Sequence, residues 1–368
     1  MDILAEANRL RAGGQRVVSM AVGQPSDPAP QAVRDAAARA LGHGAIGYTD
    51  ALGLADLREA IAAHYREHYG IAVSPGRVVV TTGSSAGFNL AFLAMFDAGD
   101  RVAIASPGYP AYRNIMRALG LDVVEVELDG APFLDADHLR AAHAEKPLRG
   151  LLFASPANPT GAALPPEALA HLLDTARELG IAVISDEIYH RLNHAGPDTT
   201  ALAFDDEAVI INSFSKYYCM TGWRIGWMVV PEGMVRAVER IAQSLYISAP
   251  ELSQRAAIEA FGASAELEAV KQRYARSRAL LQTGLPALGF RFAAPMDGAF
   301  YAYCDVSGLS NDSMEFAKRM LREAGVAATP GAAFDTRSGA RFMRFSYAGS
   351  DADVSEALSR MGSWLNGN

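Results

Sequence analysis

The stretch NSFSKYYCMTGWRIGWMV, residues 212–229, places one lysine, Lys216, between two apolar runs. The chain otherwise prefers arginine, because its 33 basic residues comprise only four lysines and 29 arginines. The apolar and aromatic residues around Lys216 indicate a buried position at the end of a strand. Two interpretations follow. The ammonium group could reach water while its stem packs, or a depressed pKa could make the amine a nucleophile that forms a Schiff base with a carbonyl.

On both sides of this lysine, short apolar runs alternate with helical stretches from about residue 77 to residue 230. The seven runs are RVVVTTG, DRVAIASPG, LDVVEVEL, RGLLFASPA, GIAVISDE, AVIINSFS and RIGWMVV. Several are apolar on both faces, which is typical of parallel strands covered by helices. The helix-like segment PPEALAHLLDTARELG lies between two of them. The pattern predicts an α/β fold in three layers, with a mainly parallel seven-stranded sheet in the middle.

After residue 231 the pattern changes. Residues 232–283 look mostly helical, and the strand candidates GAFYAYCDV and RFMRFSYA then flank an amphipathic MEFAKRMLREAG. We expect a smaller α+β domain here, since 368 residues exceed the usual size of a single core. No low-complexity linker separates the two parts, so we expect a firm interface between them.

Composition excludes several classes of protein. The net charge of -8, without a basic stripe, argues against nucleic-acid binding. No apolar run approaches the ~20 residues that span a membrane, and MDILAEANRL does not read as a signal peptide. The two cysteines, Cys219 and Cys304, lie far apart and suggest no disulfide framework. We expect a cytoplasmic protein that binds neither nucleic acid nor membrane.

Polar side chains follow two other predicted strands. Asp186 ends the strand in AVISDEIYH, and Tyr189 comes three residues later. Ligands of open α/β sheets bind beyond the carboxyl ends of the strands. A carboxylate there could hold the positive ring nitrogen of a pyridoxal cofactor, with Tyr189 donating to its phenolate oxygen, or Asp186 could simply cap a helix or form an ion pair. Asn158, between Pro156 and Pro159, sits in a rigid turn that would position its amide, unless the segment is a plain loop.

The stretch VVVTTGSSAGFNLAF reads as a strand, a glycine and small hydroxyl residues that open a helix. Backbone N–H groups at such a helix start bind phosphate. Gly83, Ser84 and Ser85 are the candidates, although the string matches neither the dinucleotide fingerprint nor the Walker loop. Ser213 and Arg224, on either side of Lys216, could add a hydroxyl and a fixed charge to the same phosphate.

Two further residues could contact a ligand. Tyr109 in SPGYPAY could stack on a planar ring or merely pack within its loop. Arg344 in RFMRFSYA suits bidentate capture of a carboxylate, although an exposed arginine on an edge strand would look the same. The histidine pairs in HYREH and HRLNH lack the HExxH glutamate, so we expect no metal site.

Together these motifs resemble those of the class I and II aminotransferases, which are fold-type I pyridoxal-phosphate enzymes. SFSKYYCMTGWRIGW is similar to the family signature S-x-S-K-x-x-x-M-T-G-W-R-x-G. The segments AVGQPSD, GYTDALGLADLREAI, VTTGSSAGF, SPANPTGA, SDEIY and RFMRFSYA match in the family's order. The resemblance covers nearly the whole chain.

The resemblance implies a role for each candidate around the cofactor, pyridoxal 5′-phosphate. Lys216 would form the internal aldimine and carry out the proton shift. Asp186 would pair with the pyridine nitrogen, and Tyr189 and Asn158 would hydrogen-bond the phenolic oxygen. Tyr109 would stack on the ring. The phosphate would be held by Ser84, Ser85, Ser213 and Arg224, next to Gly83.

The resemblance also implies how substrate and subunits are arranged. Arg344, with Gly23 and Asn158, would bind the substrate α-carboxylate. Tyr48 resembles the tyrosine that reaches the neighbouring subunit's phosphate, which implies a homodimer with shared active sites. The family's fold implies a large cofactor-binding domain at residues 30–275 and a small domain formed by residues 1–29 plus 276–368.

The expected function is transfer of the amino group of an L-α-amino acid to a 2-oxo acid. A β-lyase or decarboxylase on the same scaffold is the alternative, since fold and cofactor do not fix the reaction, and a non-catalytic regulator is a third possibility. The segment SSAG departs from many relatives, which carry a glutamine there. No second arginine that would bind a side-chain carboxylate is identifiable, and the loops GHGAIGY (42–48) and SLYISAP (244–250) favour neutral or aromatic amino acids.

Overall fold

The seven predicted runs form one seven-stranded sheet in the computed structural model, which describes residues 2–367. The strands are β2 (Val78–Thr81), β3 (Arg101–Ser106), β4 (Asp122–Glu127), β5 (Gly150–Ala154), β6 (Ala182–Asp186), β7 (Val209–Ser213) and β8 (Gly226–Val229). They lie in the order β2-β8-β7-β6-β5-β3-β4. Strand β8 is antiparallel to both neighbours, and the other neighbouring pairs are parallel. The predicted mainly parallel sheet is confirmed.

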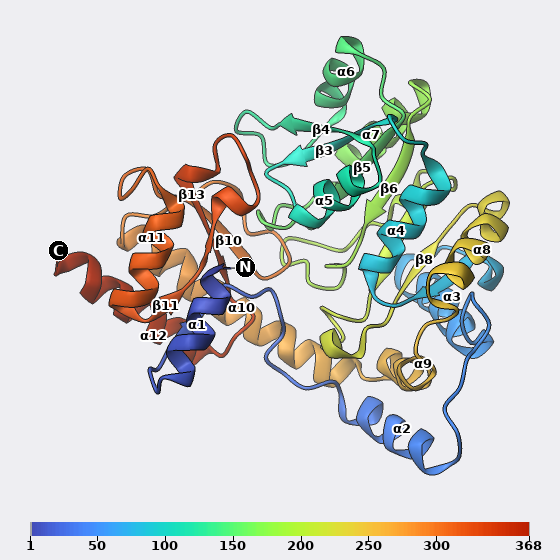
Figure 1. Ribbon diagram of the computed structural model, residues 1–368, viewed down its shortest axis with the longest axis horizontal. Coiled ribbons are helices and arrows are strands. Elements are labelled where there is room, and N and C mark those ends of the chain that lie inside the picture. The colour runs from blue at the N-terminus through green and yellow to red at the C-terminus, as the bar shows by residue number, and fades with distance from the viewer. Residues whose placement is uncertain (1, 368) are drawn as a thin grey trace.

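Helices cover both faces of this sheet and complete the three predicted layers (Figure 1). One face is covered by α4 (Ser84–Met95), α5 (Pro110–Ala118) and α8 (Val235–Tyr246), and the other by α3 (Ala55–Tyr69), α6 (Ala136–Glu145), α7 (Pro166–Glu178) and α9 (Glu251–Ile258), on which α2 (Gln31–Gly42) packs. Side chains alternate along a strand. Val79 and Ile211 therefore pack under α4 and α5, whereas Val80 and Ile210 pack on the α3 and α7 side.

A smaller α+β part follows, as predicted. Its sheets have the orders β12-β13-β10-β9, which is antiparallel, and β1-β11, which is parallel. The strands are β1 (Val18–Ser19), β9 (Arg291–Phe292), β10 (Tyr301–Asp305), β11 (Val326–Ala327), β12 (Thr329–Pro330) and β13 (Phe342–Ser346). The helices are α1 (Asp2–Ala12), α10 (Ser264–Ala287), α11 (Ser313–Arg319) with a π-helical turn (Met320–Ala324), and α12 (Asp351–Asn366).

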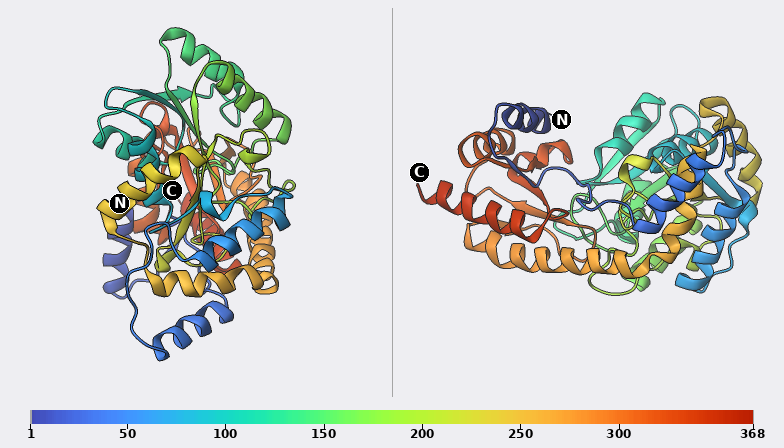
Figure 2. Two further views of the ribbon diagram at one scale, coloured as in Figure 1. Left: turned by 90° about the vertical axis from the view of Figure 1, so that its right-hand side faces the viewer. Right: turned by 90° about the horizontal axis from the view of Figure 1, so that it is seen from below.

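The two parts are joined by α10, which runs from one to the other in Figure 2. The predicted boundary between residues 275 and 276 falls inside this helix. The N-terminal segment lies with the C-terminal one, because Val18 pairs with Val326 in a parallel ladder. One hydrophobic core cluster runs from Ile210 in the large sheet to Phe345 in the small one. The domain division itself stays a prediction, and the continuous core explains why no linker is visible in the sequence.

The longest helix is not uniformly apolar. The longest, α10, has 24 residues and carries charged side chains along its length, among them Glu266, Lys271 and Arg273. Within residues 2–367 no helix combines the length and the apolar character needed to cross a bilayer.

The central strands should carry much of the stability. Ile210 in β7 is fully buried against the α3 and α7 layer. We expect Ile210→Ala to lower the free energy of unfolding by about 3 kcal/mol and Ile210→Val by about 1 kcal/mol, because the first leaves the larger cavity. Urea titration measures both. The exposed Leu309→Ala should change stability by less than about 0.5 kcal/mol, and an equal loss there would contradict this account of the core.

Candidate active site

The predicted site residues converge at the edge of the large sheet where the parallel strands end. Asp186 is the last residue of β6, and Lys216 follows the end of β7 by three positions. Tyr109 and Asn158 lie in the loops after β3 and β5. All four line one cavity of about 610 Å³, which lies between the large sheet and the smaller part. The structure thus brings together side chains that are far apart in the sequence.

Lys216 is half-buried, and its Nζ donates a hydrogen bond of 2.6 Å to the carbonyl oxygen of Gly23. Burial, and then the positive charge of Arg344, lower the pKa of Lys216 to about 8. Asp186 opposes this shift, and Arg224 adds to it more weakly. Arg344 of the smaller part thus lowers the Lys216 pKa more than Arg224 does.

Asp186 is a buried carboxylate in the wall of the cavity. Its Oδ2 accepts a hydrogen bond from the hydroxyl of Tyr112, and its Oδ1 accepts one of 3.0 Å from the backbone N–H of Ile188. Burial raises the pKa of Asp186 to about 6, whereas the Tyr112 hydrogen bond lowers it. Sequence analysis did not identify Tyr112, which also lines the cavity. Its position in SPGYPAY, one helical turn after Tyr109, was the available signal.

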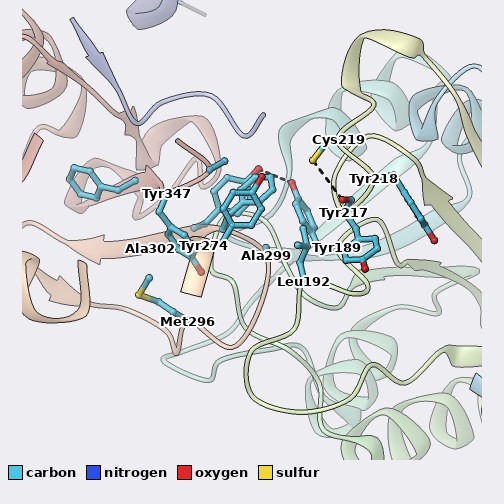
Figure 3. Packing of buried hydrophobic residues seen from close by; sticks show 14 of the residues in the cluster. Tyr189, Leu192, Tyr217, Tyr218, Cys219, Tyr274, Met296, Ala299, Ala302 and Tyr347 are labelled. Carbon is cyan, nitrogen blue, oxygen red and sulfur yellow. Dashed lines mark hydrogen bonds between the residues drawn. The ribbon is translucent and has the colours of Figure 1, made fainter. Parts of the chain in front are cut away.

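Tyr189 shares a hydrogen bond of 2.7 Å with Tyr301, hydroxyl to hydroxyl, and both line the cavity. Figure 3 shows Tyr189 between core residues of the smaller part, such as Tyr274, and the loop that carries Tyr217. Tyr301 also explains Gly23, since a Cβ at that position would lie 1.8 Å from the Tyr301 hydroxyl. Tyr301 was not predicted, because its partners lie far away in the sequence.

Arg344 is buried in β13, which lies between β12 and β10. The alternative interpretation, an exposed arginine on an edge strand, is therefore wrong. Its Nη1 donates to Asn158 Oδ1 at 2.8 Å, and its Nη2 donates to the carbonyl of Ala21 at 2.6 Å. Its guanidinium lies 4.3 Å from the centre of the Tyr301 ring. The Arg344 Nε is buried and has no hydrogen-bond partner among residues 2–367. Asn158 uses its oxygen here, which leaves its amide nitrogen as the group that can donate.

The helix start after β2 has the form expected of a phosphate site. Gly83 caps α4 with φ +78°, a conformation that side-chain-bearing residues rarely adopt. A Cβ there would lie 2.5 Å from Arg224 Nη2, so the guanidinium lies directly against the glycine backbone. Ser84 and Ser85 form the first turn of α4 and line the cavity with Arg224. Helix N–H groups, hydroxyls and a guanidinium are thus gathered in one place.

Three predicted residues, Gly83, Ser213 and Tyr48, do not line the cavity, although Gly83 lies directly against Arg224, which does. Ser213 is buried behind it, where its hydroxyl lies 2.8 Å from Ser215 Oγ and 3.1 Å from the carbonyl of Ile225. Ser215, the second serine of the motif, lines the cavity instead. Tyr48 lies outside the cavity as well, with 81% of its surface exposed.

These donors fit pyridoxal 5′-phosphate. A buried carboxylate suits a positive ring nitrogen, a glycine cradle with no room for a Cβ suits a phosphate, and an amine with a lowered pKa suits the aldehyde. Within residues 2–367 no group of three or more His, Cys, Asp or Glu side chains is arranged to bind a metal ion.

Comparison with known proteins agrees with this assignment. The family "Aminotransferase class I and II" matches residues 15–361. The chain is 50% identical to a valine–pyruvate aminotransferase of Mycobacterium tuberculosis, over 99% of this chain and 95% of that one. It is 36% identical to an aspartate/prephenate aminotransferase of Thermus thermophilus, over 97% and 93%.

A crystal structure of an aminotransferase from Mycobacterium tuberculosis superimposes with a TM-score of 0.96 at 48% identity, covering 100% of this chain and 96% of that one. Nothing in these comparisons favours the lyase or decarboxylase alternative. The chain therefore belongs to the class I and II aminotransferases, and it is a pyridoxal-phosphate-dependent enzyme that transfers an amino group from an amino acid to a 2-oxo acid.

Proposed function

We propose that the amino donor is a neutral aliphatic L-amino acid, with valine and pyruvate as the first pair to test. The observation that carries this proposal is the charge inventory of the cavity. Among the described residues that line it, the cations are Lys216, Arg224 and Arg344, and the single carboxylate is Asp186. Each cation has a role in the reaction, so no positive charge remains for an acidic side chain. The valine–pyruvate aminotransferase at 50% identity supports the same substrates.

The cavity also has apolar lining that suits an apolar side chain. Ile3 and Leu4 from α1, Val22, Met314 from α11 and Phe334 contribute to it, and the Phe334 ring lies 4.7 Å from the Arg344 guanidinium. A carboxylate buried against them without a partner would cost several kcal/mol. A branched aliphatic side chain would instead gain about 25 cal/mol per Å² of apolar surface that it buries.

Lys216 would act as the base and acid at the reacting carbon. Bound pyridoxal 5′-phosphate supplies an electron sink that makes the substrate Cα–H acidic. Lys216 Nζ, with a pKa of about 8, is close enough to neutrality to accept that proton at physiological pH and to return it. Gly23 would orient the amine, because its carbonyl accepts the Nζ hydrogen bond.

The remaining residues would hold the two ligands in place. Asp186 would hold the ring nitrogen as an ion pair, and Tyr112 would keep that carboxylate charged and oriented. Arg344 would bind the substrate α-carboxylate through its guanidinium, which lines the cavity. Tyr109 would stack on the ring, and Tyr189 with the Asn158 amide would donate to its phenolic oxygen. Those that would hold the phosphate are Gly83, Ser84, Ser85, Ser215 and Arg224, with Ser213 orienting Ser215.

We also propose that the enzyme is a homodimer and works in the cytoplasm. Tyr48 is exposed in an apolar neighbourhood that includes Leu41 and Ile46, which are exposed as well. A second subunit would cover these side chains, and the Tyr48 hydroxyl would reach the phosphate site of that subunit. The buried free thiols of Cys219 and Cys304 suit a reducing compartment.

The substrate proposal predicts a clear preference. With pyridoxal phosphate bound, valine should convert the enzyme to its pyridoxamine form, and pyruvate should restore it. Aspartate should react with kcat/KM at least about 100-fold lower, because its side-chain carboxylate would be buried unpaired. The visible absorbance spectrum, recorded with a panel that includes phenylalanine and glutamate, measures both half-reactions. A preference for aspartate would refute the neutral-substrate proposal and leave the aminotransferase assignment intact.

The depressed pKa of Lys216 predicts the pH dependence of cofactor binding. Only the neutral amine attacks the aldehyde, so the rate of pyridoxal phosphate capture should rise with pH and level off above about pH 8. Stopped-flow absorbance of the apo-enzyme measures this rate. Arg344→Gln removes the nearby like charge and should move the midpoint to higher pH. A midpoint near that of an ordinary lysine, 10.5, would contradict the proposed electrostatics.

The shared site predicts complementation between two defective subunits. Tyr48→Phe should weaken cofactor binding by roughly tenfold, the effect of one lost hydrogen bond to a charged group, and Lys216→Ala should abolish activity. A mixed dimer has one site with Lys216 from one subunit and Tyr48 from the other. Activity at low cofactor concentration should therefore recover when the two variants are unfolded and refolded together, and no recovery would count against a shared site.

A further inference from the structure

The turn after β6 has two sides, and only one belongs to the site described above. Asp186 and Tyr189 face the cavity. Glu187 and His190 do not line it, yet they are 1% and 5% exposed. Burying a carboxyl group or an imidazole costs free energy unless hydrogen bonds or an ion pair compensate. Both lie in the turn that carries two proposed cofactor contacts.

Glu187 is held by hydrogen bonds that suit its ionised form. Its Oε1 accepts from Ser185 Oγ at 3.2 Å, Thr200 Oγ1 at 2.9 Å and the Ala201 N–H at 2.9 Å. A carboxylate can only accept hydrogen bonds, and all three of these groups can donate. Its Oε2 has no hydrogen-bond partner among residues 2–367, but it lies 3.4 Å from His190 Nδ1.

His190 connects the same turn to a helix. Its Nδ1 lies 2.7 Å from the hydroxyl of Tyr69 in α3, and its backbone N–H donates to the Glu187 carbonyl at 3.0 Å. The turn is therefore tied to α3 through His190 and to residues 200–201 through Glu187. These contacts all lie on the side away from the cavity.

We propose that Glu187 and His190 are positioning residues, which fix the Asp186–Tyr189 turn from behind and set the electrostatic potential at Asp186. This inference rests on the proposed role of Asp186 as the partner of the ring nitrogen. Neither side chain touches substrate or cofactor. They act on Asp186 in opposite directions, and neither side chain adds a charge to the cavity itself.

Glu187 and His190 have opposite effects on the pKa of Asp186. Burial raises the pKa of Asp186 most, the charge on His190 lowers it and the charge on Glu187 raises it. The other titratable groups near the pair are His64, Tyr65, His68, Arg191, Asp198 and Tyr218. Burial lowers the pKa of His64 to about 3, so that imidazole stays neutral over the working range.

The two residues should therefore shift the site in opposite directions. Glu187→Gln removes a negative charge, so groups in the site lose their protons more readily. The midpoint of a pH titration of the visible absorbance, with pyridoxal phosphate bound, should therefore fall. His190→Gln removes the imidazole whose Coulombic effect lowers the Asp186 pKa, and the midpoint rises. A unit charge a short distance away, at an effective dielectric constant of about 20, shifts a midpoint by on the order of half a pH unit or more. A merely structural role would not produce shifts of opposite sign.

The measurement is the pH titration of the visible absorbance of the enzyme with bound pyridoxal phosphate. Tyr69→Phe is the matched control, since it removes the hydroxyl at 2.7 Å from His190 without changing a charge. It should lower the melting temperature while moving the midpoint by less than about 0.2 pH unit. Asp186→Asn reports whether Asp186 itself affects the spectrum.

A lower midpoint for Glu187→Gln together with a higher one for His190→Gln supports the inference. Unchanged midpoints, or shifts in the same direction, overturn it if Asp186→Asn alters the titration. If Asp186→Asn leaves the titration unchanged, the proposed role of Asp186 fails, and this inference fails with it. Should His190→Gln not fold, Glu187→Gln decides alone: a fall in the midpoint supports the inference, and no change overturns it.

Discussion

Parallel strands all end at the same edge of a sheet, and this constraint assembles the site. The strands β3, β5, β6 and β7 end side by side, and each end or following loop carries one polar side chain: Tyr109, Asn158, Asp186 and Lys216. Strand β8 runs the other way, so its beginning rather than its end lies at this edge, which places Arg224 beside the start of α4. Each side chain is thus held by a strand that is buried on both faces, and little backbone freedom remains to be lost when a ligand binds.

The second organising factor is the burial of charge. Arg344 approaches from the smaller part, where it hydrogen-bonds Asn158 and lowers the pKa of Lys216. One guanidinium can therefore attract an anionic substrate and keep the amine reactive. The pKa of Asp186 is raised by burial and lowered by the hydrogen bond from Tyr112. The reactivity of the site depends on the closeness of these groups more than on any one of them.

Much of this was predictable from the sequence, for identifiable reasons. The seven strands were predicted because residues buried on both faces leave continuous apolar runs, and Asp186 and Lys216 because each follows such a run. Tyr112, Tyr301 and Ser215 were not predicted as site residues. Their roles depend on contacts across the fold, such as Tyr189 with Tyr301, 112 positions apart, and no local pattern encodes those. The Arg344–Asn158 bond, across 186 positions, shows the same limit, since its two ends were predicted but their contact was not.

The pairing of β1 with β11 has a consequence for how the molecule is made. Strand β1 leaves the ribosome long before its partner β11, as the contact between Thr329 and Ala21, 308 positions apart, illustrates. The strands of the large sheet, by contrast, lie within residues 78–229 and can meet early. Domains generally fold as units during synthesis, and distant contacts close slowly. The wall that carries Ile3 and Leu4 therefore belongs to a segment whose strand partner is synthesised 308 positions later.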